Sequence, residues 1–548
     1  MRARLVSSLL CCIAYCLALA ACAGRSGSAS PAGGTGTGGS GSGTTVFGTD
    51  VLTYHNDAMR TGQNLTETLL TPQNVNVSSF GKLRILASDG LVDAAPLIVS
   101  GISLGGAMRN VVYLVSEHDS VYAYDADSGA LLLHTSLLGS GESSSDPRGC
   151  SQVSPEIGIT ATPVIDRSAG PNGTLFVVAM SRDGSGNYYQ RLHALDLLTL
   201  ADRLPAATIQ ASAPGNGPDS SGGVLQFDPK QYKERAALLL VNGQLYLAFA
   251  SHCDIQPYNG WIMAYSESTL AQTAVLQLTP NGSEGAIWDA GGLAADSAGA
   301  LYATVANGTF DTTLDTHGMP GQQDFGNAAL RIALTGSALT VGDYFTPFNT
   351  ASESANDVDL GSGSVVLLMD QTDSAGTIHH LMAVGGKDAT LYVLDRDDMG
   401  RFNPSANATY EQLSLGGGLY SAPVYFNGSV YLGDVGGTLK AYRFANAQLP
   451  ATPNSQTSTT FAYPGTSPAL SAQGSANAIL WALESAAGSA AVLHAYNPAN
   501  LGEEYYNSTQ AAGGRDSFGD GNKFITPVIA NGKVFIGTPD GVAVFGLL

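Results

Sequence analysis

Short runs of alternating apolar and polar residues, each closed by a polar turn, recur along most of the chain. Alternation with a period of two is typical of β-strands. Units of this kind at a spacing of roughly 50 to 75 residues are the signature of a radial β array. Six nearly identical copies carry the pattern: Tyr122-Ala123-Tyr124-Asp125, His193-Ala194-Leu195-Asp196, Met263-Ala264-Tyr265-Ser266, Tyr392-Val393-Leu394-Asp395, Lys440-Ala441-Tyr442-Arg443 and His494-Ala495-Tyr496-Asn497.

A second repeat precedes the first and consists of a strand that opens with a small residue and often Pro-Val. Its clear copies are Ala95-Pro96, Thr162-Pro163-Val164, Ala422-Pro423-Val424, Ser467-Pro468 and Thr526-Pro527-Val528, with degenerate copies near Ala236, Gly291 and Gly363. Asn-Gly pairs, which tolerate the positive φ of tight hairpins, follow at Asn172, Asn242, Asn427 and Asn531. These repeats predict an all-β propeller of eight four-stranded antiparallel blades, with seven blades as the alternative.

The last unit, residues 526–548, has room for only three strands. Residues 82–86, ahead of the first blade, have the alternation of a strand that could complete it. Closure by both termini removes an exposed sheet edge, which would otherwise invite aggregation. We therefore expect residues 46–548 to form one ring.

The amino-acid composition limits the kinds of molecule that the chain is expected to bind. The chain has 67 glycines and 13% charged residues, which suits short strands and tight turns. Its net charge is −21, whereas nucleic acids and anionic lipid headgroups bind clustered Lys and Arg. We expect no nucleic-acid partner, and we expect a monomer.

The N-terminus has Arg2 and Arg4, an apolar run over 5–21, and Cys22 at the end of that run. This resembles a bacterial lipoprotein signal peptide, which implies cleavage after residue 21 and a palmitate-bearing lipid on Cys22. A transmembrane helix is the alternative, but the run is at the short limit for about 30 Å of hydrocarbon. Residues 22–45, rich in Gly, Ser and Thr, are expected to be a flexible tether. The domain would then be exported and anchored to the cell envelope, facing the periplasm or the cell surface.

The mature domain keeps two of the six cysteines, because Cys11, Cys12 and Cys16 lie in the signal segment and Cys22 takes the lipid. In an oxidising compartment the remaining pair, Cys150 and Cys253, is expected to form a disulfide. Two unpaired thiols are the alternative.

With Tyr54-His55-Asn56-Asp57, Arg60-Thr61-Gly62 and the run 70–75, the repeats resemble the pyrroloquinoline-quinone-type propeller family. The resemblance covers almost all of the chain after the tether. That family includes alcohol dehydrogenases that hold the quinone and Ca²⁺ in the propeller axis, and non-catalytic members that bind other proteins. The resemblance thus implies either of two functions.

The resemblance also implies site residues, in the order that the family has them. Trp288 matches the tryptophan floor under the quinone, and Asn307 matches a Ca²⁺ ligand. Asp359 matches the catalytic base, which also lies by the metal, and Lys387 matches the cation that contacts the quinone oxygens. An equally simple interpretation makes them a core aromatic, a turn residue, a strand-end cap and a solvated strand end.

Three departures bear on activity. The family's Ca²⁺-ligating glutamate is replaced by Ser185, with Asp183 as a shifted substitute. The adjacent cysteine pair over the quinone is missing from the mature domain, and so is a Cys-x-x-Cys-His haem segment. These departures favour a binding or scaffolding module for an envelope protein or polymer, with a degenerate quinone site. The alternative is a dehydrogenase that oxidises an alcohol or sugar with pyrroloquinoline quinone and Ca²⁺.

Overall fold

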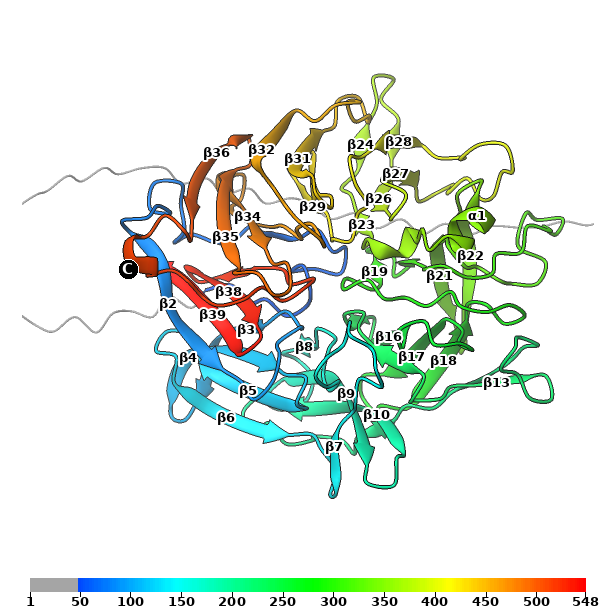
Figure 1. Ribbon diagram of the computed structural model, residues 1–548, viewed down its shortest axis with the longest axis horizontal. Helices are drawn as coiled ribbons and strands as arrows, with labels where there is room; N and C mark the ends of the chain where they lie inside the picture. The colour runs from blue at the N-terminus through cyan, green and yellow to red at the C-terminus, as the bar shows by residue number, and fades with distance from the viewer. Residues whose placement is uncertain (1–47) are drawn as a thin grey trace, which may run out of the picture. The chain divides into compact units, whose positions relative to one another are not determined.

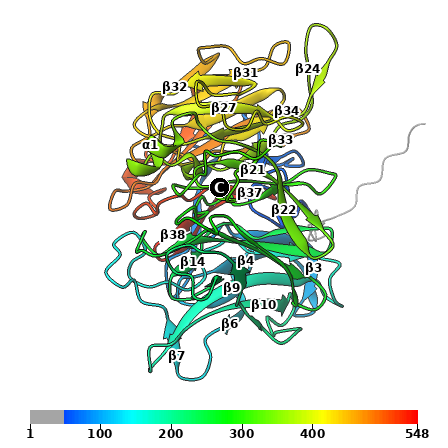
Figure 2. The same ribbon diagram turned by 90° about the vertical axis from the view of Figure 1, so that its right-hand side faces the viewer.

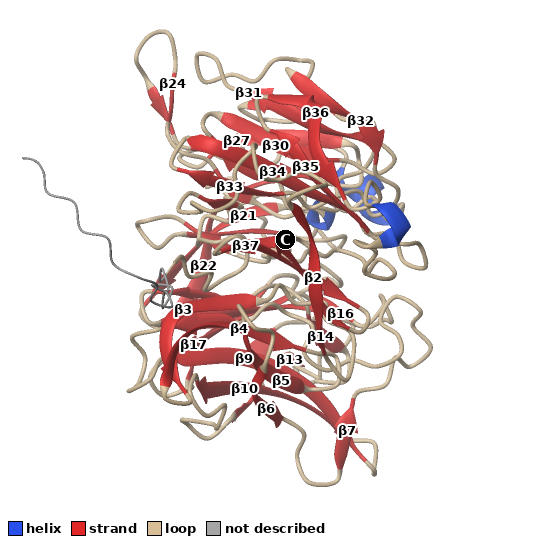
Figure 3. Ribbon diagram, turned by 90° about the vertical axis from the view of Figure 1, so that its left-hand side faces the viewer, coloured by secondary structure: helices blue, strands red, loops and turns tan. Residues whose placement is uncertain are grey.

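The computed structural model describes residues 48–548. The expected signal peptide (1–21), lipidated Cys22 and tether (22–45) lie outside these residues. The described chain contains 39 strands, one short helix, α1 (Thr350–Ala355), and two 3-10 turns, η1 (Leu360–Ser362) and η2 (Ala512–Gly514). Figure 3 shows how little of it is helical. No helix among these residues is long and apolar enough to cross a membrane.

Eight antiparallel sheets form the blades of a propeller, and Figure 1 views the ring with colour passing round it from blue to red. The first four blades follow one another in chain order. They are β3 (Leu97–Leu104), β4 (Ala107–Val115), β5 (Ser120–Asp125) and β6 (Leu131–Ser136); β8 (Val164–Asp166), β9 (Thr174–Asp183), β10 (Tyr188–Asp196) and β11 (Ala207–Thr208); β15 (Leu239–Val241), β16 (Gln244–Ser251), β17 (Trp261–Ser266) and β18 (Gln272–Gln277); and β19 (Ala294–Ala295), β20 (Leu301–Thr304), β21 (Ala329–Thr335) and β22 (Ala338–Phe345).

The last four blades continue the same up-and-down order. They are β23 (Val366–Leu367), β26 (Leu381–Gly385), β27 (Thr390–Asp395) and β28 (Glu411–Ser414); β29 (Val424–Phe426), β30 (Ser429–Gly433), β31 (Thr438–Arg443) and β32 (Ser455–Thr460); β33 (Ala469–Gln473), β34 (Ala476–Glu484), β35 (Val492–Asn497) and β36 (Asn500–Asn507); and β37 (Val528–Ala530), β38 (Lys533–Thr538), β39 (Gly541–Leu547) and β2 (Phe80–Ala87). In the side view of Figure 2, β9 and β10 lie on the opposite side of the ring from β31 and β32.

Seven short additional strands extend three blades and form two hairpins. β1 (Gln63–Asn64) pairs with β33, β7 (Glu142–Ser144) with β9, and β14 (Tyr232–Glu234) with β16. Two hairpins lie outside the blades: β12 (Ser212–Pro214) with β13 (Val224–Gln226), and β24 (Gln371–Thr372) with β25 (Ile378–His379).

The ring closes as the sequence predicts. β2 pairs antiparallel with β39 from Phe80↔Leu547 to Ala87↔Gly541, so the N-terminal strand becomes the outer strand of the last blade. Figure 1 shows blue β2 beside red β38 and β39. The prediction of eight blades is confirmed, and the seven-bladed alternative is excluded.

The hairpin turns follow the predicted chemistry with one exception. Asn242, Asn427 and Asn531 adopt φ values of 53°, 47° and 55°, the left-handed conformation that a tight hairpin requires. Asn172 is absent from the positive-φ residues, and its side-chain Nδ2 instead donates to Asp196 Oδ2 at 2.8 Å. In that turn the following Gly173 adopts the positive φ, 85°, and the Asn172 side chain adds a hydrogen bond.

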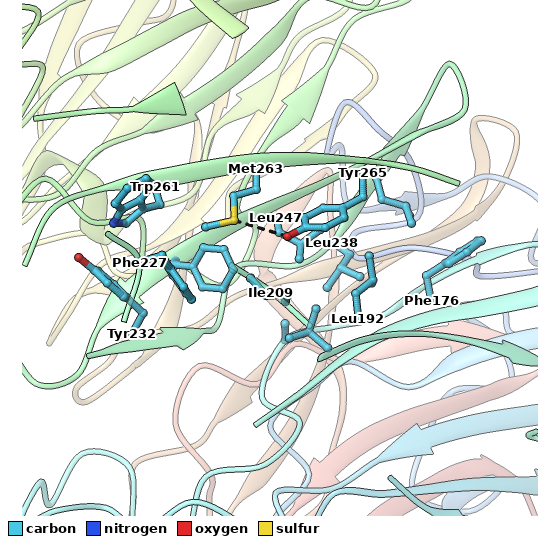
Figure 4. Packing of buried hydrophobic residues seen from close by; sticks show 14 of the residues in the cluster. Phe176, Leu192, Ile209, Phe227, Tyr232, Leu238, Leu247, Trp261, Met263 and Tyr265 are labelled. Carbon is cyan, nitrogen blue, oxygen red and sulfur yellow. Dashed lines mark hydrogen bonds between the residues drawn. The ribbon is translucent and has the colours of Figure 1, made fainter. Parts of the chain in front are cut away.

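The core lies between neighbouring blades. Figure 4 shows one such layer, in which Phe176 and Leu192 of the second blade face Leu247 and Met263 of the third. These four side chains are fully buried, as is that of Trp261 beside them. Because every blade packs against a neighbour on both faces, a middle strand such as β26 is buried at every position, whereas an outer strand such as β32 alternates between exposed positions and buried or half-buried ones.

A segment ahead of the first blade, residues 51–64, forms hydrogen bonds with all eight blades. The contacts are Val51 N–H to Ile98 O (2.9 Å), Ile165 N–H to Leu52 O (2.8 Å), Arg60 to Leu238 O (3.2 Å), Ala295 N–H to Ala58 O (2.7 Å), Leu367 N–H to Met59 O (3.0 Å), Tyr425 N–H to Thr61 O (2.9 Å), Leu470 N–H to Gly62 O (2.8 Å) and Asn64 Nδ2 to Ile529 O (2.8 Å). We call residues 51–64 the axial segment.

Arg60 anchors the axial segment. Its side chain is 1% exposed and donates to the carbonyls of Leu293 and Tyr54 at 3.0 and 3.1 Å, in addition to Leu238 O. It also donates to Thr53 Oγ1 at 2.8 Å. Burial lowers the pKa of Arg60 to about 10, so the guanidinium stays charged at neutral pH. One buried cation thereby joins the axial segment to the third and fourth blades.

Candidate functional site

A cavity of about 610 Å³ opens where the inner strands of the blades begin. Many of the residues that line it occupy the same place in their blades, four to seven positions before the first residue of the inner strand. Arg235 precedes β15, Trp288 precedes β19, Asp359 precedes β23, Tyr420 precedes β29, Tyr463 precedes β33 and Phe524 precedes β37. Loops between the second and third strands of a blade emerge at the same face, because neighbouring strands are antiparallel. They add Asp254, Asn307 and Lys387.

The cavity brings together the four residues that the resemblance singled out. Trp288, Asn307, Asp359 and Lys387 all line it, although they span 100 positions of the chain. Gly386 makes part of this approach possible: a Cβ there would lie 2.4 Å from Asp359 O. The backbone N–H of Lys387 therefore reaches Asp359 O at 2.8 Å.

Lys387 forms two ion pairs. Its Nζ lies 2.6 Å from Asp359 Oδ2 and 2.6 Å from Asp357 Oδ1. The Asp359 side chain is 6% exposed, whereas that of Asp357 is 77% exposed. Burial alone would lower the pKa of Lys387, but the two carboxylates reverse the effect and raise it. Burial raises the pKa of Asp359 despite the neighbouring ammonium.

Asn307 completes this cluster. Its backbone N–H donates to Asp359 Oδ1 at 2.6 Å, and its Nδ2 donates to Asp357 Oδ1 at 3.0 Å. Its Oδ1 is buried without a hydrogen-bond partner. One oxygen of Asn307 thus lacks a partner, while both oxygens of Asp359 are already engaged.

The donor set does not fit Ca²⁺, which takes six to eight oxygens. Within residues 48–548, no group of three or more His, Cys, Asp or Glu side chains is arranged to hold a metal ion. Asp359 presents its Oδ2 to the Lys387 ammonium, so a cation would have to displace that side chain. Ser185 and Asp183, considered above as replacements for the family's glutamate, lie at the β9–β10 hairpin and do not line the cavity.

Aromatic residues that the sequence analysis did not single out form one wall. The ring of Trp288 lies 6.1 Å from those of both Tyr420 and Phe524. Tyr463 lies 5.3 Å from Tyr420 and 6.2 Å from Phe524. The Lys387 ammonium lies 5.8 Å from the Trp288 ring, within cation–π range. A flat organic group could pack against this wall.

Two further acids, Asp254 and Glu284, were also missed as cavity residues. Both have positive φ, 54° and 68°, in loops at the cavity. Burial raises the pKa of Glu284, and the negative charges of Asp254 and Asp359 raise it further. A hint was available in the sequence: each acid stands in a polar loop that precedes a strand of the repeat.

The disulfide expected from the sequence joins Cys150 and Cys253, whose Cα atoms are 6.1 Å apart. It links two loops that are 103 residues apart in the chain, and Cys253 lines the cavity. His252 Nε2 donates to Pro147 O at 3.0 Å, next to this bridge. The bridge therefore holds part of the cavity rim.

The fold is similar to that of solved quinoprotein dehydrogenases. The quinohemoprotein alcohol dehydrogenase ADHIIG from Pseudomonas putida HK5 aligns at a TM-score of 0.56 and 14% identity, covering 91% of this chain and 80% of that one. The quinohemoprotein alcohol dehydrogenase from Comamonas testosteroni gives 0.55 and 13%, covering 91% and 80%. A europium-containing methanol dehydrogenase gives 0.58 and 11%, covering 92% and 99%. No protein-family model and no curated protein matches the chain. At these identities the likeness shows the fold alone.

Proposed function

We propose that this propeller is a binding module of the bacterial cell envelope. Its axial cavity would be the evolutionary remnant of a quinone site that no longer binds Ca²⁺. The cavity would hold an organic ligand, and the loops around its mouth would contact an envelope protein or polymer. The anchor would be a lipid on Cys22, following the N-terminal pattern of the sequence.

One observation carries the proposal. The buried carboxylate of Asp359 has the Lys387 ammonium on one oxygen and the Asn307 N–H on the other. A carboxylate engaged in this way is a poor ligand for a hard cation, because the cation would have to replace a charge-assisted hydrogen bond and an ion pair. Both oxygens of Asp359 are thus occupied by groups of this chain.

A second function is favoured by a different observation, the convergence of all four family-matched residues on one cavity. In a dehydrogenase, Trp288 and Lys387 would hold pyrroloquinoline quinone, which supplies a two-electron acceptor when bound. Asp359 would accept the proton of the alcohol or sugar hydroxyl. The cavity volume and the aromatic wall fit a flat quinone, whereas the donor set does not fit Ca²⁺.

Titration of the purified full chain with pyrroloquinoline quinone, with and without Ca²⁺, distinguishes the binding module from the dehydrogenase. The readouts are quinone absorbance, melting temperature and dye-coupled oxidation of alcohols and sugars. A binding module is expected to show no effect of Ca²⁺ on quinone binding and no dye reduction. Saturable, Ca²⁺-dependent binding that raises the melting temperature, together with turnover, would replace this proposal with the dehydrogenase.

A further inference from the structure

Another cavity, of about 360 Å³, lies between the sixth and seventh blades. Figure 1 shows these blades as neighbours in the ring, with β29, β31 and β32 beside β34, β35 and β36. None of the described residues lines both this cavity and the axial cavity. We call it the interblade cavity.

The interblade cavity lies at the face of the propeller opposite to the axial cavity. Much of its lining comes from four turns, β29–β30, β31–β32, β33–β34 and β35–β36. Each of them joins the first strand of a blade to the second, or the third to the fourth, and in an antiparallel sheet such turns emerge at one face. The axial cavity opens at the other face, where the inner strands begin. A ligand in one cavity therefore leaves the other free.

Small side chains leave the space for this cavity. Ala441 of β31 and Ala478 of β34 line it, and both belong to the apolar layer between the two blades. Elsewhere in the same layer the residues are larger, such as Leu439 and Leu480, which are fully buried. Because a protein interior is otherwise close-packed, two alanines at the end of the layer leave room that a ligand can occupy.

Hydrogen bonds between the blades hold the walls of the cavity. Tyr431 OH donates to Pro498 O at 3.1 Å, and the backbone N–H of Leu501 donates to Ser455 Oγ at 2.6 Å. Tyr431, Ser455 and Pro498 all line the cavity. Since both bonds join the sixth blade to the seventh, the cavity has its shape before anything binds, which lowers the entropic cost of binding.

Three exposed side chains at the cavity have polar groups left for a ligand. Among the residues that the structure describes, neither the Asn427 amide nor the Arg443 guanidinium has a hydrogen-bond or ion-pair partner. Asn454 Oδ1 accepts from the backbone N–H of Arg443 at 2.7 Å, which leaves Asn454 Nδ2 unused. Together these groups provide several donors and an amide oxygen as acceptor.

The composition of the lining indicates the class of ligand. Its apolar residues are Pro72, Phe426, Tyr431, Ala441, Ala478, Pro498, Ala499 and Tyr505, and its polar residues are Asn427, Ser429, Arg443, Asn454, Ser455, Ser475, Asn477 and Asn497. Among these described residues none has a branched aliphatic side chain, and Arg443 is the one that carries a charge. Amides and hydroxyls both donate and accept, so they complement the hydroxyl groups of a sugar. Rings, prolines and alanines give flat apolar surfaces, which suit the C–H face of a sugar ring.

The charge at the cavity favours an uncharged ligand. Arg443 is exposed, and an exposed ion pair with an acidic sugar would contribute little affinity. Its guanidinium presents a rigid fork of N–H donors, which bind neighbouring hydroxyls without a charge on the ligand. The volume also lies in the range of about 300–1,000 Å³ that small-molecule sites occupy.

We infer that the interblade cavity binds an uncharged saccharide, with its hydroxyls at Asn427, Arg443 and Asn454 and a ring face on the flat apolar part of the lining. This inference goes beyond the proposed function, because it concerns the opposite face of the propeller and does not depend on what the axial cavity holds. It concerns binding alone and involves no chemical step.

The test is a binding screen of the full chain on immobilised oligosaccharides. The array carries uncharged oligomers of hexoses, N-acetylhexosamines and pentoses beside oligomers of uronic acids. The chain is expected to bind at least one uncharged class in preference to the uronic acids. Isothermal titration calorimetry with that oligosaccharide should then give an affinity that changes less than about twofold between about 50 and 500 mM NaCl, because no ion pair is formed.

Two substitutions locate the binding. Asn427→Gly removes the amide and keeps the turn, because glycine readily adopts the φ of 47° found at this position. Asn454→Asp keeps the acceptor for the Arg443 N–H and removes the Nδ2 donor. Each should weaken binding about three- to tenfold, the effect of one lost hydrogen bond. Asn242→Gly is the matched control, because Asn242 has a φ of 53° in the corresponding Asn-Gly turn of the third blade, outside both cavities.

Three results would overturn the inference: no binding to any uncharged oligosaccharide, a preference for the uronic acids, or an unchanged affinity in both Asn427→Gly and Asn454→Asp. None of them bears on the axial cavity, which the quinone titration tests separately. Melting curves show whether each variant is folded. If the turn variants do not fold, Arg443→Met provides the same comparison from an exposed side chain.

Discussion

Replacing Lys387 by Met tests whether its ammonium occupies the position that a metal ion would take beside Asp357 and Asp359. The change removes two ion pairs at once, both at 2.6 Å. The pair with Asp357 is exposed on the acid side and contributes about 0–1 kcal/mol. The pair with Asp359 is buried, and its loss leaves an unpaired carboxylate, which costs about 3–5 kcal/mol.

The expected change in melting temperature follows from this free energy. A domain of about 500 residues has an unfolding entropy of about 1 kcal/mol/K, so Lys387→Met should lower the melting temperature by about 3–5 °C at pH 7. The loss should shrink in acid, because Asp359 is then protonated in both proteins. Since the folded-state pKa of Asp359 is raised, its contribution falls as the pH rises from about 3.8 through that raised value. Without the ammonium that window should extend to higher pH.

Differential scanning calorimetry with and without Ca²⁺ is the assay. In Lys387→Met the oxygens of Asp357 and Asp359 face the vacated position, so Ca²⁺ should raise the melting temperature of the variant and not that of the wild type. Lys440→Met is the control, because Lys440 pairs with the buried Asp434 outside the cavity and should be destabilised without any response to Ca²⁺. A variant that melts within about 1 °C of the wild type, or a wild type that Ca²⁺ stabilises equally, would refute the reasoning.

Three other predictions concern the scaffold. Replacing both Cys150 and Cys253 by Ser opens a link across 103 residues, which should cost up to about 4.7 kcal/mol in urea unfolding, and a loss below about 1 kcal/mol would argue against the bridge. Arg60→Met leaves three buried carbonyls without their donor at about 1–3 kcal/mol each, so calorimetry should show a strongly destabilised or unfolded ring, whereas a near-native melting temperature would mean that the axial segment does not hold the blades. Because burial raises the folded-state pKa of Glu117 to about 7, stability should fall as the pH rises from about 4.5 to 7, and Glu117→Gln should flatten that slope in pH-dependent melting; an unaltered slope would assign it to another group.

Much of the fold could be predicted from the chain alone. Alternation of apolar and polar residues is a local property, so the strands at Tyr122, Tyr392 and His494 are legible without knowledge of their neighbours. Closure by residues 82–86 was predictable for a related reason, since a three-stranded last unit needs one more strand. The conformation of Asn172 was not predictable, because in this Asn-Gly pair Gly173 alone adopts the positive φ and the Asn172 side chain hydrogen-bonds Asp196.

The candidate site was only partly predictable. Resemblance placed Trp288, Asn307, Asp359 and Lys387 in order, and the structure puts all four on one cavity. Nothing in the sequence indicates that the Lys387 ammonium would lie between two carboxylates, since that depends on the close approach at Gly386.

The sequence by itself determined the repeating unit, the number of blades and the means of closing the ring, because each depends on local periodicity and on counting strands. Only the tertiary structure decided which loops lie together around the opening of the axial cavity. Arg235 and Phe524 are almost 300 residues apart in the chain, yet their side chains stack at 4.2 Å. Such contacts arise because ring closure brings the first strands of all blades around one axis, and the charge balance there depends on every blade at once.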